Sequence, residues 1–317
     1  MSNARNLANL LGTGTQITTA DIADGAFQAN KNLIINGAMQ VAQRGTSFSG
    51  ITDQYTLDRW TSSSAGGVSL NVSQQTATST DNGYFASKHF ARYQRNAVLS
   101  GFVHKVEDLQ QFNNKTFTLS FWAKSADAGT TVTLTTYTVN DGSTLNSYVT
   151  RTYVTNPTLS STWQKYEVRL AFQDMYAYGY SGSHHLRLQF FDGSNAATFD
   201  ITEVQLELGD TATPFEHRSY GDELARCQRY YYAIDMSVIS GFHPAVLAAG
   251  LSYLIQYFPF PSEMRAAPSC TTTAIPGGGG SLSISVGATK THALGRYDQS
   301  IAGSWASIQT FTASAEL

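Results

Sequence analysis

The sequence has few charged residues, and this scarcity excludes several classes of protein. Asp, Glu, Lys and Arg make up 14% of its 317 positions, and 23 acidic against 20 basic residues give a net charge of -3. An average soluble protein carries about 25% charged residues. Because a nucleic-acid-binding protein needs a basic face to neutralise phosphates, we expect no nucleic-acid partner.

Cysteines and long apolar runs are also scarce. Cys227 and Cys270 are the only cysteines, too few for a disulfide framework or a zinc site made of cysteine alone. We expect both to be buried free thiols, the alternative being a single disulfide bridge between them. The first residues contain no apolar run of seven or more, so no signal peptide is expected. Polar residues and a proline interrupt the most apolar stretch, 245–260, so we expect no membrane insertion.

The residues that replace the missing charge are typical of a β-protein. The chain has 26 Gly, 17 Tyr and 17 Phe, and aromatic residues favour strands while glycine favours turns. In the segment 115–124, Phe117, Leu119, Phe121 and Ala123 alternate with polar residues and share one face of a predicted strand. Similar runs occupy 131–139, 165–172, 186–190 and 199–208.

These runs predict an all-β chain with two jelly-roll-like β-sandwiches in tandem. The first sandwich is expected over 33–210, where turn signals separate short strands. A connector follows over 211–230, extended at first and then a short helix at 223–230, opened by Asp222 and Glu223. The second sandwich is expected over 231–317. Its strand-like runs are 231–238, 245–258, 269–275, 281–286 and 305–315, which indicates about six strands.

Residues 1–32 differ from the rest of the chain. Leucines at helical spacing are followed by three widely spaced apolar residues in a small, polar segment. Such a segment cannot form a core alone and is expected to pack on the body of the protein or on a partner. The six apolar residues are Leu7, Leu10, Leu11, Ile17, Ile22 and Phe27.

No pattern in the sequence predicts a catalytic site. Glu203 and Glu207, or Asp192 and Asp200, are candidate carboxylate pairs for glycoside hydrolysis, but no spacing sets either pair at the required separation. Metalloprotease, serine-hydrolase and phosphate-loop motifs are absent from the sequence. We therefore expect a protein that is not an enzyme.

Tyrosines in polar, turn-rich surroundings are the candidate glycan-binding residues. Tyr176, Tyr178 and Tyr180 stand at alternate positions beside a predicted loop, and Tyr84 and Tyr93 flank another. Aromatic rings offer flat apolar faces to the C–H groups of sugars, while nearby polar groups bind the hydroxyls. The alternative is that these rings fill the sandwich core or a subunit interface.

Four segments in fixed order resemble carbohydrate-binding modules of the family 4/9/22 type. They are Asn32-Leu-Ile-Ile-Asn-Gly-Ala-Met-Gln40, 115–124, Ser161-Thr-Trp-Gln-Lys-Tyr-Glu-Val168 and 199–206. The resemblance implies a jelly roll that binds polysaccharide and a structural calcium ion. Gln40 and Glu203 stand at the positions where such modules carry calcium-binding acidic residues. Only Glu203 of the two is charged, and calcium prefers several carboxylates. We therefore expect no cofactor, the alternative being a structural calcium ion at these positions.

A second resemblance is to virion proteins of tailed bacteriophages, many of them tail fibres. It is carried by Gln43-Arg-Gly-Thr-Ser-Phe48, Tyr55-Thr-Leu-Asp-Arg-Trp60, 211–220, 223–231 and 311–317. It implies a homotrimer in the virion, assembled in the host cytoplasm. The six apolar residues of 1–32 would attach it to other virion proteins.

Together the two resemblances imply a fibre or spike that binds host-surface polysaccharide for adsorption. The alternative is a purely structural head-fibre, decoration or tail adaptor protein that binds only other virion proteins. A glycan-degrading spike is the weakest hypothesis, because the sequence lacks a carboxylate constellation.

Overall fold

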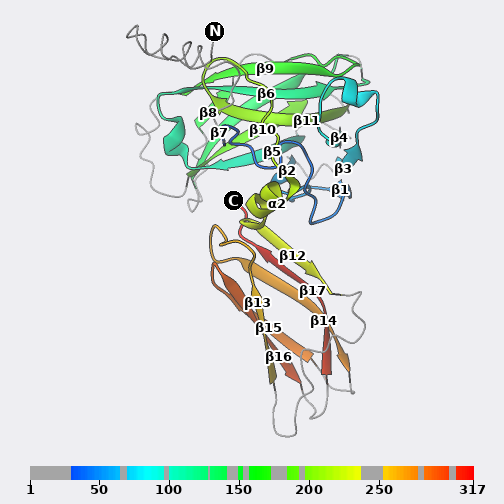
Figure 1. Ribbon diagram of the computed structural model, residues 1–317, viewed down its shortest axis with the longest axis vertical. Helices are drawn as coiled ribbons and strands as arrows, with labels where there is room; N and C mark the ends of the chain where they lie inside the picture. Colours follow the sequence, from blue (N-terminus) through cyan, green and yellow to red (C-terminus); the bar gives the residue numbers. More distant parts are fainter. Residues whose placement is uncertain are drawn as a thin grey trace, which may run out of the picture.

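Four antiparallel sheets, stacked in two pairs, make up the fold (Figure 1). The computed structural model describes residues 30–64, 70–95, 100–127, 129–140, 149–152, 157–172, 184–192, 197–236, 253–277, 282–299 and 305–317. The predicted all-β class with two β-sandwiches is confirmed.

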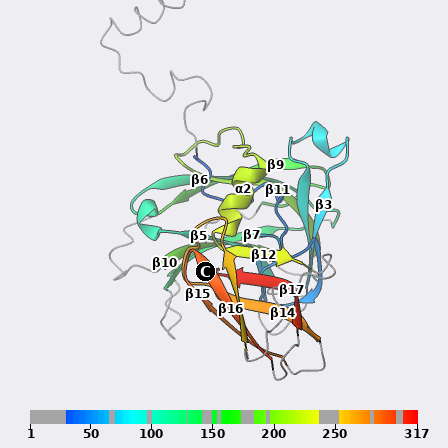
Figure 2. The same ribbon diagram turned by 60° about the horizontal axis from the view of Figure 1, so that its bottom comes forward.

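The first sandwich pairs a six-stranded sheet with a five-stranded sheet. The strand orders are β1-β3-β4-β11-β6-β9 and β2-β5-β10-β7-β8, and Figure 2 shows the two sheets as separate layers. The strands are β1 (Ser47–Ile51), β2 (Trp60–Ser64), β3 (Leu70–Thr76), β4 (His89–Arg95), β5 (Ser100–Glu107), β6 (Thr116–Lys124), β7 (Val132–Asn140), β8 (Val149–Thr152), β9 (Gln164–Ala171), β10 (His184–Asp192) and β11 (Ala197–Leu208). Two short 3-10 helices, η1 (Asp81–Gly83) and η2 (Leu109–Phe112), lie between strands.

Alternating apolar side chains fill the space between the two sheets. The inward-facing residues of β6 are almost fully buried, as their alternation predicts. Trp60 lies in the same core, where its ring stacks on Phe102 at 4.5 Å and its indole N–H donates to the carbonyl of Asn36 at 3.0 Å. The indole therefore contributes apolar area without leaving a buried donor unpaired.

The opening segment packs against β11 as coil, held by two buried asparagine side chains. Asn32 donates to the carbonyl of Val204 at 3.1 Å and accepts from the N–H of Leu206 at 3.1 Å. Asn36 donates to the carbonyls of Val41 and Asp58. These amides thus pair buried backbone groups of both the opening segment and β11.

The second sandwich is built from two three-stranded sheets, ordered β12-β17-β14 and β13-β16-β15. Phe258 and Phe311 stack at 4.2 Å in its core, beside Met264 and Tyr297. Its strands are β12 (Tyr231–Asp235), β13 (Tyr253–Pro259), β14 (Ser269–Gly277), β15 (Leu282–Ala288), β16 (His292–Gln299) and β17 (Trp305–Ser314). The sequence runs did not include β16, because its inward positions are partly filled by small residues, Ala293 and Gly295.

The connector ends in a helix that begins earlier than predicted. Helix α2 (Tyr220–Gln228) starts three residues before the expected Glu223. The hydroxyl of Ser219 caps it by accepting from the N–H of Asp222 at 3.2 Å. The acidic residues that signalled the start therefore occupy the first turn, where the helix dipole favours them, instead of the cap.

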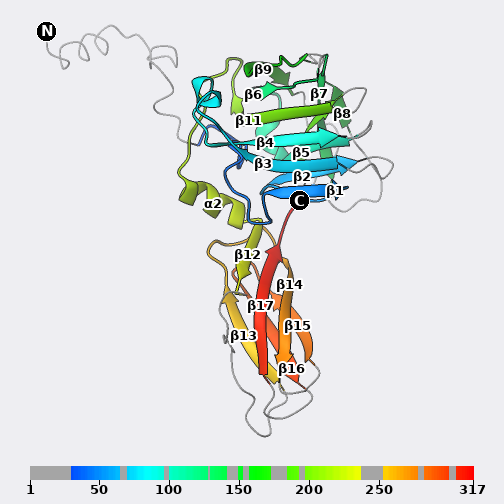
Figure 3. The ribbon, with the colours of Figure 1, turned by 90° about the vertical axis from the view of Figure 1, so that its right-hand side faces the viewer.

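Residues 315–317 return to the first sandwich and join the two units (Figure 3). Glu316 forms ion pairs with Arg44 at 3.1 Å and with Arg59. The guanidinium of Arg59 lies 3.5 Å from the centre of the Tyr230 ring, and that of Arg44 lies 3.5 Å from the centre of the Tyr231 ring. We call this contact the joint.

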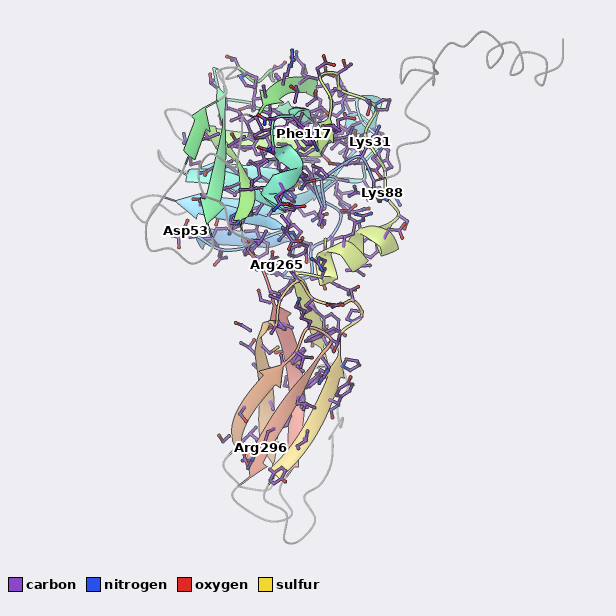
Figure 4. The ribbon with its side chains drawn as sticks, turned by 90° about the vertical axis from the view of Figure 1, so that its left-hand side faces the viewer. Lys31, Asp53, Lys88, Phe117, Arg265 and Arg296 are labelled. Carbon is purple, nitrogen blue, oxygen red and sulfur yellow. The ribbon has the colours of Figure 1, made fainter. Side chains whose placement is uncertain are left out.

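The edge of the joint carries further charge pairs. Glu107 of β5 accepts a hydrogen bond from Arg229 at 3.1 Å and forms an ion pair with Arg265 at 3.5 Å. Figure 4 shows Arg265 at the level where the two sandwiches meet. The side chains of the joint come from four separate segments of the chain, 43–48, 55–60, 223–231 and 311–317.

Both cysteines are free. Burial raises the pKa of the Cys227 thiol well above its usual range and that of Cys270 to about 11. Because the thiolate is the reactive form, neither residue is a nucleophile at neutral pH.

Gly37 provides a direct test of the close packing between the opening segment and β11. A Cβ atom at this position would lie 2.1 Å from the carbonyl oxygen of Val204. We expect Gly37→Ala to lower the free energy of unfolding by about 2–3 kcal/mol, measured by urea denaturation, because the backbone must move. The control is Gly83→Ala, where a Cβ would meet nothing within 4 Å. It should change stability by less than about 0.5 kcal/mol, and equal effects of the two variants would contradict this packing.

Candidate functional site

The outer face of the six-stranded sheet carries a polar groove. Strands β4, β6 and β11 supply its floor, and their outward positions alternate with the core residues. The groove has a volume of about 400 Å³. Its lining, here called the charged groove, consists of Arg92, Gln94, Lys124, Ser125, Ala126, Asp127, Ser161, Thr198 and Asp200.

Ion pairs fix the charged side chains of the groove. Arg92 donates two hydrogen bonds to the carboxylate of Asp200, at 2.8 and 2.9 Å. The ammonium of Lys124 lies 3.2 Å from Asp81 and 3.9 Å from Asp200. The side chains of Arg92 and Lys124 are 38% and 24% exposed. Donors on both residues therefore reach solvent in a fixed geometry.

Asp81 anchors the loop that covers one end of this face. It accepts hydrogen bonds from the indole N–H of Trp163 at 2.6 Å and from the N–H and hydroxyl of Thr78 at 2.9 and 2.7 Å. Burial alone would raise the pKa of Asp81, but these hydrogen bonds and that from Lys124 hold it below its usual range. A glycosidase acid requires a raised pKa, so Asp81 is unsuited to that role.

An exposed aromatic pair lies beside the charged groove. Tyr84 is 43% exposed, and its ring meets that of the half-buried Trp122 edge-to-face at 6.2 Å. A buried cluster of Phe85, Phe90 and Trp163 supports the pair from below. Trp122 stands two residues before Lys124 on β6, about 7 Å away along the same face. Tyr84 and Trp122 are called the aromatic pair below.

The structure places the tyrosines proposed from the sequence in different surroundings. Tyr84 belongs to the aromatic pair. The prediction for Tyr93 is wrong, because this residue occupies an inward position of β4 and is 0% exposed, against Phe102 and Phe199 at 5.7 and 5.0 Å. Tyr176, Tyr178 and Tyr180 lie outside the described residues.

Sequence reasoning missed Trp122, Arg92 and Lys124, and it considered Asp200 only as a candidate glycosidase carboxylate. Trp122 carried a usable signal, because it stands at an outward position of a strand whose inward positions were already assigned to the core. A large aromatic residue on the solvent side of a strand is a candidate contact residue. The pairing of Arg92 with Asp200 depends on strand order and had no sequence signal.

Gln40 and Glu203 lie beside a second pocket, of 440 Å³. Gln40 lines it, and Glu203 lies behind Ser87, from which it accepts hydrogen bonds through the N–H at 3.0 Å and the hydroxyl at 2.9 Å. The same carboxylate oxygen accepts from the N–H of Ala86 at 3.0 Å. Glu203 occupies a β-bulge with a φ of 48°, which turns its side chain toward these donors.

This arrangement does not fit calcium. The ion prefers several carboxylates, whereas the only carboxylate of the predicted pair already binds three protein donors. Within the described ranges, no group of three or more histidine, cysteine, aspartate or glutamate residues is placed to hold a metal ion.

The carboxylate pairs considered from the sequence do not form a catalytic dyad. Glu203 binds the loop at Ser87, while Glu207 accepts from the N–H and hydroxyl of Thr213 in the connector. Asp200 is engaged by Arg92, and the side chain of Asp192 is outside the described part. Glu203 and Glu207 thus each fasten a different segment to β11.

The proposed attachment residues, Leu7, Leu10, Leu11, Ile17, Ile22 and Phe27, also lie outside the described residues. In the part of the chain that the structure describes, no helix is long and apolar enough to cross a membrane.

Comparison with known proteins gives distant structural likenesses only. No family model matches the chain, and no curated protein matches its sequence. The enzymatically active domain of tailspike protein 4 from bacteriophage CBA120 shares 15% identity and a TM-score of 0.36, over 56% of this chain and 22% of that chain. This chain thus spans about a fifth of the tailspike chain.

Carbohydrate-binding modules give likenesses of the same degree. A family 22 xylan-binding domain from Paenibacillus barcinonensis shares 17% identity over 52% of this chain and 94% of its own, with a TM-score of 0.34. A family 11 module from Clostridium thermocellum shares 15% identity over 54% and 98%, with a TM-score of 0.32. All three scores lie below 0.5, and the fold assignment rests on the strand pairing of this chain itself.

The hydrogen bonds of Asp81 predict a loss of stability in acid. The pKa of Asp81 is lower in the folded chain than in the unfolded chain, so its contribution is complete above about pH 4 and is lost as the pH falls below that value. We expect Asp81→Asn to be less stable than wild type at neutral pH and to lose less stability between pH 5 and pH 3. Urea denaturation of both proteins at each pH gives the free energy of unfolding as a function of pH. An equal dependence on pH in wild type and variant would contradict the assigned role of Asp81.

Proposed function

We propose that this chain is a non-enzymatic appendage protein of a tailed-phage virion, a homotrimer that binds host-surface polysaccharide. The observation that carries the glycan-binding part is the aromatic pair beside the charged groove. Tyr84 is 43% exposed next to Trp122, and the adjoining groove offers charged, amide and hydroxyl groups. One face of a rigid sheet thus combines the two kinds of contact that a sugar requires.

The aromatic pair would bind the apolar C–H faces of sugar rings, since aromatic rings present flat apolar surfaces with polar edges. Gln94, Asp127 and Ser161 are exposed around the groove and would bind hydroxyl groups. The ion pairs hold Arg92 and Lys124 in place, so little conformational freedom would be lost on binding. A shallow site of this kind binds weakly, and several copies on one particle would add avidity.

Binding without catalysis is the role that the carboxylates support. Asp81 and Asp200 are both paired with cations in the groove. Because the pKa of Asp81 is lowered, this residue would not hold the proton that a general acid must donate. The groove would therefore recognise a glycan and release it unchanged.

The virion setting rests on the resemblance of five segments to phage proteins. Four of these segments supply side chains to the joint, so they act together in holding the two sandwiches. This common role supports the proposed virion setting. Residues 1–32 would attach the trimer to other virion proteins, and the sandwiches would extend outward.

A purely structural role is the second candidate. It is favoured by exposed apolar side chains on the second sandwich, which suit a protein partner better than a glycan. The two roles predict different results for polysaccharide binding. The first requires binding through the aromatic pair, and the second requires none.

Replacing the aromatic pair tests the proposed glycan site. We expect Tyr84→Ala and Trp122→Ala each to weaken binding by about tenfold, the effect of losing an aromatic contact worth about 1.4 kcal/mol. The wild-type chain is first screened on an array of bacterial surface polysaccharides, and the strongest ligand is then titrated by calorimetry.

Tyr220→Ala is the matched control. Tyr220 is 56% exposed at the start of helix α2, and it is not part of the lining of the charged groove. Its loss should leave affinity unchanged. Absence of any polysaccharide ligand, or full affinity in both test variants, would discard the proposed site.

A further inference from the structure

The outer face of the sheet β13-β16-β15 exposes a row of large apolar side chains. Tyr253, Ile255 and Tyr257 of β13 are 41%, 60% and 52% exposed, and Leu294 of β16 is 44% exposed. These four residues are called the apolar face. Seven large hydrophobic side chains are exposed in the described ranges, so more than half of them gather on this one surface.

Strand alternation places these residues outside the core. Within Tyr253–Pro259, Phe258 points inward and is 3% exposed, while positions 253, 255 and 257 point outward. Leu294 is the direct cross-strand partner of Tyr257 and continues the row onto β16. Since the core is already filled from the other face, the apolar residues outside are not needed for packing within this sandwich.

β13 is also an edge strand of its sheet among the described strands. It pairs with β16 alone among the described strands, so its other edge leaves backbone N–H and C=O groups without a strand partner. Its seven residues include no charge, and its one proline, Pro259, stands at the end of the strand. Monomeric proteins usually protect such an edge with charged residues, prolines within the strand or a covering element.

The opposite sheet of the same sandwich has a different outer surface. Thr271 and Thr273 of β14 are exposed, and their hydroxyls pair with those of Thr312 and Thr310 at 2.6 and 2.7 Å. This threonine face is polar and hydrogen-bonded within itself. The apolar face is therefore a local feature, and the overall composition of the domain does not account for it.

The charges beside the apolar face neutralise each other. Arg296 forms hydrogen bonds with Asp298 on the same strand, at 2.8 and 3.0 Å, and its guanidinium lies 4.3 Å from the centre of the Tyr253 ring. Figure 4 shows Arg296 on the outer surface of the second sandwich, far from Arg265 at the joint. A surface with its charges paired in this way can contact its own copy without like-charge repulsion.

We propose that the apolar face is a contact surface between copies of this chain. A second copy would supply both partners that the surface lacks, namely apolar side chains and an edge strand with free backbone groups. A polysaccharide would supply hydroxyls but little apolar area for Ile255 and Leu294. The apolar row follows the edge strand β13, where Ile255 and Tyr253 lie directly opposite Arg296 and Asp298 of β16. Ser283 and Ser285 are exposed on β15, so paired charges and hydroxyls border the row on its inner side.

This contact rests on the proposed homo-oligomer and specifies which surface joins its copies. It does not depend on the glycan site. The four side chains offer on the order of 400 Å² of apolar surface, about half of what one partner contributes to a stable interface. The association should therefore be concentration-dependent.

Light scattering after size-exclusion chromatography of the full chain tests the contact. We expect wild type to have a multiple of the 34.4 kDa chain mass. Ile255→Asp should fall to the single-chain mass, because a charge would be buried in an apolar contact. Leu294→Ser, on the neighbouring strand, should shift the mass in the same direction and guards against misfolding of the first variant. Thr273→Asp, on the threonine face, should keep the wild-type mass.

The outcomes separate this contact from the broader proposal. A wild-type monomer at every concentration would overturn both the contact and the homo-oligomer. An oligomer that persists in folded Ile255→Asp and Leu294→Ser would overturn the contact alone. Loss of polysaccharide binding in Ile255→Asp with unchanged mass would identify a glycan as the occupant and also overturn it. The mass measurements do not bear on the aromatic pair, which its own variants test.

Discussion

The buried ion pair between Arg59 and Glu316 is the interaction on which the arrangement of the two sandwiches depends. Their side chains are 1% and 5% exposed. Burial alone would lower the pKa of Arg59, but the neighbouring carboxylate of Glu316 outweighs it and raises that pKa. An unpaired charge inside a protein costs several kcal/mol. Separating the sandwiches would break this ion pair, and a guanidinium or carboxylate that stayed buried would then lack its partner.

Other contacts surround this pair and give the joint its specificity. The rings of Tyr230 and Tyr231 cover Arg59 and Arg44, and Gln43 donates to the carbonyl of Tyr231 at 2.9 Å. The connector is fastened separately, since Glu216 accepts from the N–H groups of Asn30 and Asn32 at 2.7 Å each. The proposed glycan site on one sandwich and the apolar face on the other are thereby held in one fixed relation.

The sequence predicted the features that depend on local pattern and missed those that depend on strand order. Alternation in 115–124 located β6 and its core face, and turn signals indicated two sandwiches. Tyr93 was misassigned because a tyrosine beside a loop signal can still occupy an inward strand position. The groove joins Arg92 of β4, Lys124 of β6 and Asp200 of β11, which meet only after the sheet has formed. The ion pair of Arg59 with Glu316 spans most of the chain and had no local signal.

Differential scanning calorimetry of the full chain tests the joint most directly. The account predicts that wild type unfolds in one transition, whose calorimetric and van't Hoff enthalpies agree. Glu316→Gln leaves Arg59 buried without its partner and should cost about 3–5 kcal/mol, splitting the transition into two. Glu167→Gln is the control, because Glu167 is 51% exposed and forms its ion pair with Lys165 on the surface. This variant should unfold at the wild-type temperature. Two transitions in wild type, or a single unshifted transition in Glu316→Gln, would contradict the claim that this buried pair couples the sandwiches.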